Sequence, residues 1–320
     1  MADKKQPANN TSVSIEKLTG ELPYKMTNDY LFKAFFQKNE PALKGLLCAI
    51  LSLQPEDISS VEITNPIQIG ETMDDKTVIL DIKLLLNNQQ LINLEMQVKN
   101  MADWPERSLT YLCRMFDNLH KGEDYGKVKP SLHISVVDFT PKGFPESLFL
   151  KYYLYHIDNP EHPQNIHKYS DKFGIYMLQL NQLGRTDDMQ SMPELYYWAQ
   201  FFKATTWEEI KMLAQNNETI KQGIVTLKEL TADEKVKMQL EAREQYYRDL
   251  NAILDYEKQE KDKEIHSLQS ALQQAEAEKN KFQEESAKFQ EESAKFQEES
   301  SKKDERIRFL EEQLAKASQK

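Results

Sequence analysis

Residues 281–301 hold three consecutive copies of one seven-residue unit, Lys-Phe-Gln-Glu-Glu-Ser-Ala, with the third copy ending in Ser301. Seven residues make almost two turns of α-helix, so each copy returns its Phe to the same side of a helix. The same heptad register continues without a slip from Ile265 to Ala317. We therefore expect this part of the chain to be one long helix outside any globular core.

The core positions of this register are apolar at both ends of the segment and mixed in the middle. They are Leu268, Ala275, Phe282, Phe289, Phe296, Lys303, Leu310 and Ala317 at one position, and Ile265, Leu272, Lys279, Ser286, Ser293, Ser300, Ile307 and Leu314 at the other. This pattern favours a coiled coil through which residues 265–317 self-associate into a homo-oligomer. One Phe per heptad is also compatible with a single solvated helix. Ser and Phe at core positions specify neither the number of helices nor their orientation.

The rest of the chain has the composition of a globular protein. Of 320 residues 39% are hydrophobic, with 14 Phe and 14 Tyr, which is enough to build a core. We expect a loose polar arm at 1–22 and a globular domain with a helical extension at 23–230. A helical linker at 231–264 and the coiled coil at 265–320 complete the predicted organisation.

Charge and cysteine content exclude several classes of protein. The net charge of −11 does not indicate a general polyanion-binding surface, so any contact with nucleic acid has to be local and assisted by a metal ion. With only Cys48 and Cys113, neither a disulfide framework nor a Cys-based zinc site is expected. No apolar signal core is present near the N-terminus, and no apolar run is long enough to span a membrane, so we expect a cytoplasmic protein.

Apolar spacing and turn residues predict a series of elements. Helices are expected at 29–36, capped by Asn28, from Pro41 to about Leu53, and from Asp103 or Trp104 to about Lys121-Gly122. Strands are expected at 61–64, 77–86, 91–98, 131–139, 147–157 and 173–180, with Asn87-Asn88 as a tight turn. Amphipathic helices are expected at 193–204, 207–215 and 218–227.

The hairpin formed by 77–86 and 91–98 carries the strongest candidate site. Side chains alternate between the faces of a strand, so Glu95 and Gln97 share one face while Leu94, Met96 and Val98 occupy the other. Asp81 can meet Glu95 and Gln97 across the hairpin. Two carboxylates on an otherwise apolar strand pair suit Mg²⁺, which prefers oxygen ligands and keeps several waters.

An Asp followed on the next strand by Glu-x-Lys, within the order helix, three strands, helix, strand, is the pattern of the PD-(D/E)XK nuclease superfamily. The chain resembles this pattern, with Gln97 in the place of Lys. The further matches are Asn28-Asp29-Tyr30-Leu31-Phe32-Lys33, Leu80-Asp81-Ile82, Asn93-Leu94-Glu95-Met96-Gln97, Arg107-x-x-x-Tyr111 and Gly122-x-x-Tyr125. As an ordered set over about residues 24–260, these resemble the bacterial Rpn (recombination-promoting nuclease) or PD-(D/E)XK nuclease family transposase group.

The resemblance implies an α/β fold with a mixed sheet, a restriction-endonuclease-like αβββαβ core, and Mg²⁺-dependent (or Mn²⁺-dependent) endonuclease activity on DNA. Asp81, Glu95 and the backbone carbonyl of Met96 would hold the metal, whose bound water would attack phosphorus. Gln97 can position a water but supplies no positive charge. Lys99, or alternatively Lys83, is expected to supply that charge, although both lysines can equally be exposed strand residues.

Two further pairs are expected to support the site or to contact DNA. Arg107 and Tyr111 lie four residues apart on one helical face, which can touch phosphate or be an ordinary solvated face. Asp29 and Lys33 have the same spacing on the first helix. A structural cap or salt bridge is the simpler interpretation of this pair, and a supporting role at the site is the alternative. Because Gln97 removes a charge, a catalytically weak or inactive binding and assembly module remains the alternative to an active nuclease.

Overall fold

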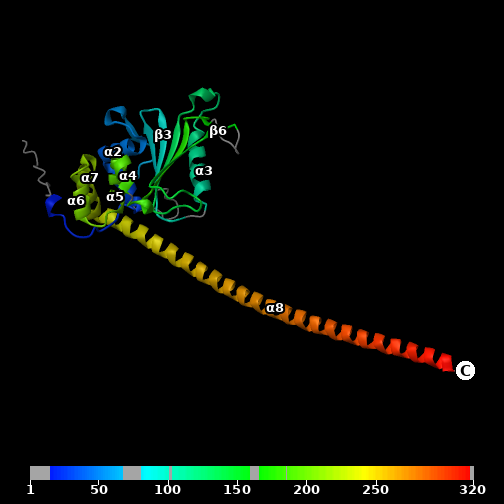
Figure 1. The fold of residues 1–320 in the computed structure, drawn as a ribbon. Helices are drawn as coiled ribbons and strands as arrows, with labels where there is room; N and C mark the ends of the chain where they lie inside the picture. The colour runs from blue at the N-terminus through cyan, green and yellow to red at the C-terminus, as the bar shows by residue number, and fades with distance from the viewer. Residues whose placement is uncertain (1–14, 68–80, 101–102, 159–165, 185, 318–320) are drawn as a thin grey trace, which may run out of the picture. The chain divides into compact units, whose positions relative to one another are not determined.

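The computed structural model describes residues 15–67, 81–100, 103–158, 166–184 and 186–317. The chain divides into two compact units, Met1–Tyr246 and Tyr247–Lys320 (Figure 1). This division falls inside the expected helical linker. Each unit is described separately below.

The first unit begins with the helices α1 (Asp29–Lys38) and α2 (Glu40–Leu51). The side chain of Asn28 accepts hydrogen bonds from the backbone N–H groups of Tyr30 and Leu31, which confirms its predicted capping role. Asn39 caps α2 in the same way through the N–H of Ala42, so α2 begins one residue before Pro41. Both helices therefore start where an Asn side chain satisfies N–H groups that have no partner within the helix.

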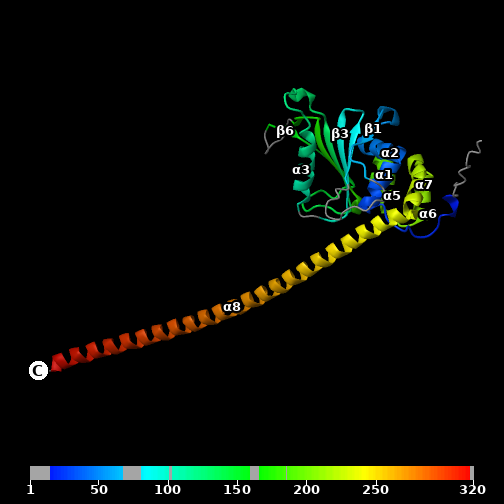
Figure 2. The same ribbon diagram turned by 180° about the vertical axis from the view of Figure 1, so that it is seen from behind.

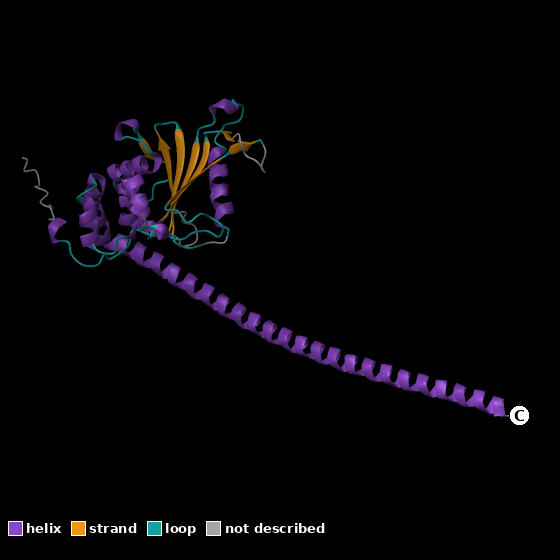
Figure 3. Ribbon diagram, viewed as in Figure 1, coloured by secondary structure: helices purple, strands orange, loops and turns teal. Residues whose placement is uncertain are grey.

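A six-stranded mixed sheet has the order β1-β2-β3-β4-β8-β5 (Figure 3). Its strands are β1 (Val61–Ile63), β2 (Ile82–Leu86), β3 (Gln90–Gln97), β4 (Ser131–Val137), β8 (Phe173–Gln179) and β5 (Phe149–Tyr153). β3, β4 and β8 run parallel, and the remaining pairs are antiparallel. The expected mixed α/β fold class is confirmed.

The turn between β2 and β3 is formed by Asn87 and Asn88, whose φ angles are 51° and 55°. Both residues thus occupy the left-handed region that a two-residue hairpin turn requires and that Asn tolerates. The predicted strand 77–86 is found as β2 from Ile82 onward. Its residues 77–80 lie outside the described part of the chain.

Helix α3 (Trp104–Phe116) begins as predicted but ends well before Lys121-Gly122. The Asn118 side chain donates to the carbonyls of Met115 and Phe116 and also bonds the backbone of Lys129 in both directions. These side-chain bonds occupy carbonyls of the last turn and tie the chain to a distant segment. The later end that the sequence suggested is therefore wrong.

The predicted strand 147–157 is divided between two sheets. β5 ends at Tyr153, whereas β6 (Tyr155–Ile157) pairs with β7 (Ile166–Lys168) in a separate two-stranded sheet. The other helices of this unit are α4 (Thr186–Ser191), α5 (Pro193–Lys203), α6 (Trp207–Ala214) and α7 (Glu218–Ala232), the last longer than predicted. Short 3-10 helices occur at Ile15–Lys17, Pro55–Asp57, Tyr125–Lys127 and Leu180–Gln182.

The two faces of the large sheet are covered differently. One face lies against the layer that contains α1, α2, α5 and α7, whereas α3 lies on the other face (Figures 1 and 2). The helical layer is filled by a cluster of mutually packed rings: Phe32, Phe35, Phe36, Trp198, Phe201 and Phe202. Leu94 and Met96 of β3 point into this core, which leaves Glu95 and Gln97 facing α3.

Helix α8 (Glu234–Ala317) is 84 residues long. Its first turns belong to the first unit, where Val236 and Leu240 are buried. In the second unit the apolar heptad side chains are exposed, including Leu268, Leu272, Phe282, Phe289, Phe296, Leu310 and Leu314. Among the described helices, none is both long and apolar enough to cross a membrane.

Candidate active site

Asp81 and Glu95 lie where β2 and β3 come together. β2 pairs Ile82 with Leu94, and continuing this antiparallel register by one residue places Asp81 across from Glu95 on the same face. Their exposed fractions are only 4% and 6%. The hairpin therefore places two carboxylates on one face in the interior, and burial of two like charges side by side is costly unless a cation compensates them.

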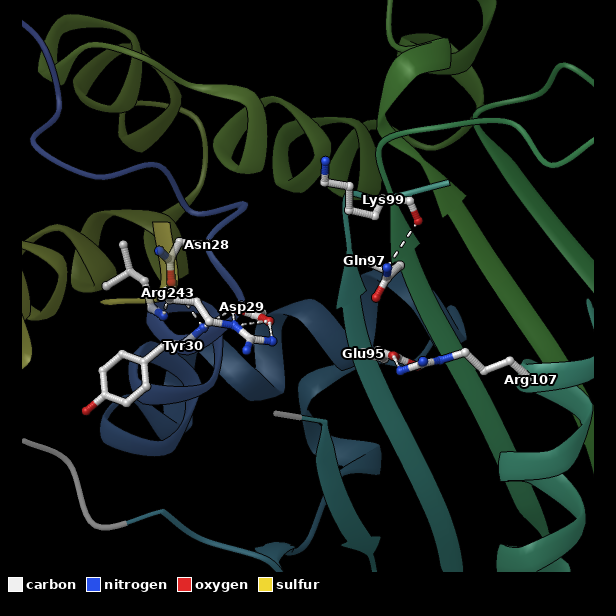
Figure 4. Close-up of polar contacts among 9 residues, drawn as sticks. Asn28, Asp29, Tyr30, Glu95, Gln97, Lys99, Arg107 and Arg243 are labelled. Carbon is white, nitrogen blue, oxygen red and sulfur yellow. Dashed lines mark hydrogen bonds and ion pairs between the residues drawn. The ribbon is translucent and has the colours of Figure 1, made fainter. Parts of the chain in front are cut away.

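The Glu95 carboxylate has one hydrogen-bonded oxygen and one unmatched oxygen. Its Oε1 accepts a bond of 3.0 Å from Nη2 of Arg107 (Figure 4), while Oε2 is buried without a hydrogen-bond partner among the described residues. Burial raises the pKa of Glu95 to about 7, against the opposing effect of Arg107. Near neutral pH this carboxyl group is thus poised between its charged and neutral forms.

Asp81 is held through its backbone, and its carboxylate is only partly satisfied. The Asp81 carbonyl accepts bonds from Nζ of Lys33 at 2.8 Å and from Nδ2 of Asn65 at 3.0 Å. Its Oδ1 is a buried acceptor for which the described part of the chain offers no donor. Burial raises the pKa of Asp81, while the nearby Lys83 and Lys33 charges act to lower it.

Arg107 is the residue of α3 that bonds the Glu95 carboxylate. Besides its bond to Glu95, its guanidinium lies 5.1 Å from the ring centre of Tyr111, one helical turn further along. Its Nε is buried and has no acceptor within the described chain. The structure thus brings Arg107 and Tyr111 into the same site as Glu95. The Nε–H donor of Arg107 is unmatched in the described chain, as are the carboxylate acceptors of Asp81 and Glu95.

Gln97 and Lys99 lie at the end of β3. The Gln97 side chain donates from Nε2 to the backbone carbonyl of Lys99 over 3.1 Å, and the Lys99 amino group points away from Glu95 (Figure 4). The Gln97 carbonyl accepts from Asp138 on the β4 side. Because successive carbonyls of a strand alternate in direction, the carbonyl of Met96 is directed to the β2 side, where Asp81 lies.

Asp29 and Lys33, both on α1, point to different neighbours. Asp29 accepts two bonds of 2.9 Å from Nε of Arg243, a residue in the first turns of α8 (Figure 4). Lys33 instead reaches Asp81. It is 2% exposed, and burial lowers its pKa to about 8, against the attraction of Asp81, so the amino group is mostly protonated at neutral pH. The sequence did not distinguish these two roles.

A buried polar network around His133 lies beside Glu95, and the sequence analysis did not predict it. His133 of β4 lies between Nδ2 of Asn93 at 3.1 Å and Oγ of Ser135 at 3.0 Å, and its Nε2 is 4.0 Å from Oε2 of Glu95. Burial lowers the pKa of His133 to about 3, so the ring is neutral. The signal was available, because Ser131, His133 and Ser135 alternate with apolar residues along the strand.

The side chains fit a divalent ion held by oxygen atoms. Oδ1 of Asp81 and Oε2 of Glu95 are buried acceptors without donors in the described structure, and buried polar atoms are normally paired. No cluster of three or more His, Cys, Asp or Glu side chains suited to a metal occurs among the described residues. Two carboxylates and a carbonyl, completed by water, nevertheless match the coordination that Mg²⁺ prefers.

Comparison with known proteins gives one match. The model of the PD-(D/E)XK nuclease family transposase family matches residues 26–257, which is more than half of the chain and includes every residue of the candidate site. No curated protein and no solved structure matches the chain. The family resemblance that the sequence motifs suggested is confirmed.

Proposed function

The chain belongs to the PD-(D/E)XK nuclease family transposase family, and from this membership we propose that it is a metal-dependent endonuclease that hydrolyses DNA phosphodiesters. The observation that supports the proposal best is the pair of unmatched oxygens on Asp81 and Glu95. Two buried acceptors without donors among the described residues lower the stability of the fold, and a ligand that satisfies both would explain why they are retained.

Asp81, Glu95 and the carbonyl of Met96 are the groups that would hold Mg²⁺ or Mn²⁺. When bound, such an ion offsets phosphate charge and lowers the pKa of a water molecule, which are the two requirements of phosphodiester hydrolysis. Both carboxyl groups have raised pKa values because they are buried, so they are suited to a cation that compensates their charge.

Three other side chains have roles in this proposal. Arg107 holds Glu95 through one oxygen, which leaves the second oxygen available, and its unmatched Nε–H can donate to a phosphate. Gln97, fixed by its bond to the Lys99 carbonyl, can accept a hydrogen bond from a water through Oε1. Tyr111 packs against Arg107 and keeps its guanidinium in place.

The heptad segment 265–317 is proposed to join copies of the chain. Its apolar side chains recur on one side of α8 and are exposed in a single chain, which is the arrangement that a coiled coil buries. The alternative function is an assembly module with weak or no chemistry, which Gln97 favours because it supplies no charge. In that case the heptad segment 265–317 would carry the function.

Plasmid cleavage and calorimetry test this proposal together. The purified full chain should nick or cut plasmid DNA with Mg²⁺ or Mn²⁺, and Asp81→Ala and Glu95→Ala should abolish cutting and weaken Mn²⁺ binding. Glu62→Ala, which removes an exposed carboxylate from the neighbouring strand β1, is the matched control and should leave both properties unchanged. Equal cutting by wild type and both site variants would refute the assignment, and tail-dependent oligomers without metal binding would favour the assembly module.

A further inference from the structure

The proposed site lacks the lysine of its superfamily pattern, and the nearby cations differ in how they could replace it. Lys83 is exposed, so solvent screens its charge, and Lys99 is directed away from Glu95 (Figure 4). Arg107 is already engaged with Glu95 and Tyr111. In the part of the chain that the structure describes, the remaining cation near Asp81 is Lys33, which belongs to α1 and lies outside the hairpin.

Lys33 is almost completely buried beside the core phenylalanines of α1, with an exposed fraction of 2%. Among the described residues, its amino group bonds the backbone carbonyl of Asp81 rather than a carboxylate side chain. Burial of an ammonium group without an ion pair is costly. The Asp81 carboxylate attracts this ammonium group without forming an ion pair with it among the described residues, and an anionic phosphate would bring a further opposite charge to the site.

Helix α1 is built to keep Lys33 in this position. Asn28 caps the helix, and its phenylalanines pack against α5 and fix its rotation. One turn after Lys33, Gln37 bonds both the carbonyl and the N–H of Ile67, at 2.7 and 2.8 Å. Lys33 and Gln37, on consecutive turns of α1, are thus bonded to the backbone of Asp81 and Ile67. These bonds order the Lys33 side chain before any ligand binds.

We propose that Lys33 supplies the positive charge missing at Gln97: held by its bond to the Asp81 carbonyl, its ammonium group stabilises anionic charge at the site. This inference rests on the proposed nuclease function. Lys33 acts only by hydrogen bonding and charge, and no proton transfer is assigned to it. Because the surroundings have a low dielectric constant, a fixed charge at this position acts more strongly than the exposed Lys83.

The inference makes opposite predictions for metal binding and for cleavage. Lys33→Met keeps the length and apolar packing of the side chain but removes its charge, so cleavage should fall about 100-fold in kcat. Mn²⁺ should bind this variant at least as tightly as wild type, because a nearby cation has been removed. A purely structural anchor would behave differently, since its loss would displace Asp81 and weaken Mn²⁺ binding.

The experiment compares four full-length proteins: wild type, Lys33→Met, Lys33→Arg and Lys38→Met. Lys38→Met is the matched control, because it removes a lysine from the same helix that is exposed and paired with Glu229. Each protein is assayed for plasmid cleavage kinetics, for Mn²⁺ binding by calorimetry and for thermal unfolding. We expect Lys33→Arg to recover at least about tenfold of the lost rate, because charge is retained, and Lys38→Met to match wild type.

Each outcome decides the inference. Undiminished cutting by Lys33→Met with an active wild type would overturn this inference alone. Joint loss of cutting and Mn²⁺ binding, or Lys33→Arg no better than Lys33→Met, would make Lys33 a structural anchor. If Lys33→Met does not fold, the comparison of wild type with Lys33→Arg decides, since a charge-based role requires activity in the latter. A wild type that neither binds Mn²⁺ nor cuts would overturn the proposed function and this inference together.

Discussion

The candidate site and the heptad helix both contain groups that the described part of the chain does not satisfy, but the groups are of opposite kinds. In the first unit, one carboxylate oxygen each of Asp81 and Glu95 is buried without a donor among the described residues. In the second unit, apolar side chains such as Phe282, Phe289 and Phe296 are exposed at 72–75% of their surface. The first arrangement leaves buried acceptors without donors among the described residues, whereas the second leaves apolar side chains exposed to solvent.

The energetic consequences of the two regions differ. Buried unmatched oxygens destabilise the fold at all times, so they are tolerated only where the rest of the core compensates. Exposed apolar groups on a long helix cost little until a second surface is available, and then drive association. We therefore expect changes at the site to affect stability and chemistry together, and changes in the tail to affect assembly alone.

The largest expected effect is on assembly. Replacement of Phe282, Phe289 and Phe296 by Ala removes three apolar groups per chain, each worth about 1.5–3 kcal/mol when fully buried. The variant should be monomeric at protein concentrations where wild type associates. Light scattering coupled to size-exclusion chromatography measures this, and plasmid cutting per site should change little.

Two controls sharpen this result. Replacement of Gln283, Gln290 and Gln297 by Ala alters the same three heptads next to the core position and should preserve association. Deletion of residues 288–294 removes one whole repeat without shifting the register, so the shortened chain should also associate. An unchanged mass for the Phe variant would mean that the heptad positions are not the contact surface.

The next effect concerns pH and stability. Below pH 4.5 Glu95 is protonated in the folded and the unfolded chain, but between 4.5 and about 7 only the folded chain keeps the proton. Unfolding then releases a proton, so the Glu95 contribution to stability falls by roughly 3 kcal/mol as the pH rises from 4.5 to 7. Denaturant titrations in EDTA should show Glu95→Gln gaining stability relative to wild type over this window, and a constant difference would contradict the raised pKa.

A divalent ion should reverse this loss. Binding to ionised Glu95 displaces its proton, so Mn²⁺ added at pH 6.5 should stabilise wild type and release up to about one proton per chain. Calorimetry in buffers with different ionisation enthalpies measures the released protons. Glu95→Gln should release fewer, which separates Glu95 from the other titrating groups.

A smaller effect is expected for Arg107→Met. The change leaves Glu95 buried without its cationic partner, which raises its pKa further and should slow cutting at pH 7 by about 10–100-fold. Part of the rate should return at higher pH, where Glu95 ionises. Arg114→Met, which removes an exposed Arg two turns along the same helix, should cut as wild type does; equal defects in both variants would indicate damage to α3.

The smallest expected effect is that of Gln97→Lys. The substitution restores the superfamily residue, yet Lys33 already places a cation beside Asp81. Cutting should therefore change by less than about tenfold, because the second cation adds little stabilisation and repels the metal ion. A large gain in rate would instead show that the site lacks a charge that no other residue supplies.

Local chemistry in the sequence was enough to predict the hairpin and its carboxylates. The helix cap at Asn28 and the tight turn at Asn87-Asn88 could be predicted, because capping and positive φ depend on the residue itself and its immediate neighbours. Leu94 and Met96 lie in the core, as the alternation around Glu95 predicted. These features depend on contacts within a few residues or across one tight turn.

The parts that were missed depend on distant segments. α3 ends at Phe116 because Asn118 bonds Lys129, and the break after Tyr153 reflects a change of partner strand. The separate partners of Asp29 and Lys33 could not be inferred, because Arg243 and Asp81 are far away in sequence. Such contacts leave no signal in local periodicity.

The tight turn at Asn87 and Asn88 has a consequence for the order in which the molecule assembles. A hairpin closed by two residues forms within microseconds, long before contacts between distant segments. We therefore expect Asp81 and Glu95 to meet early, before Arg107 of α3 reaches them. A divalent ion present during folding would relieve the repulsion between the two carboxylates at the start, so the cation required for the proposed chemistry would also assist the chain in reaching its native state.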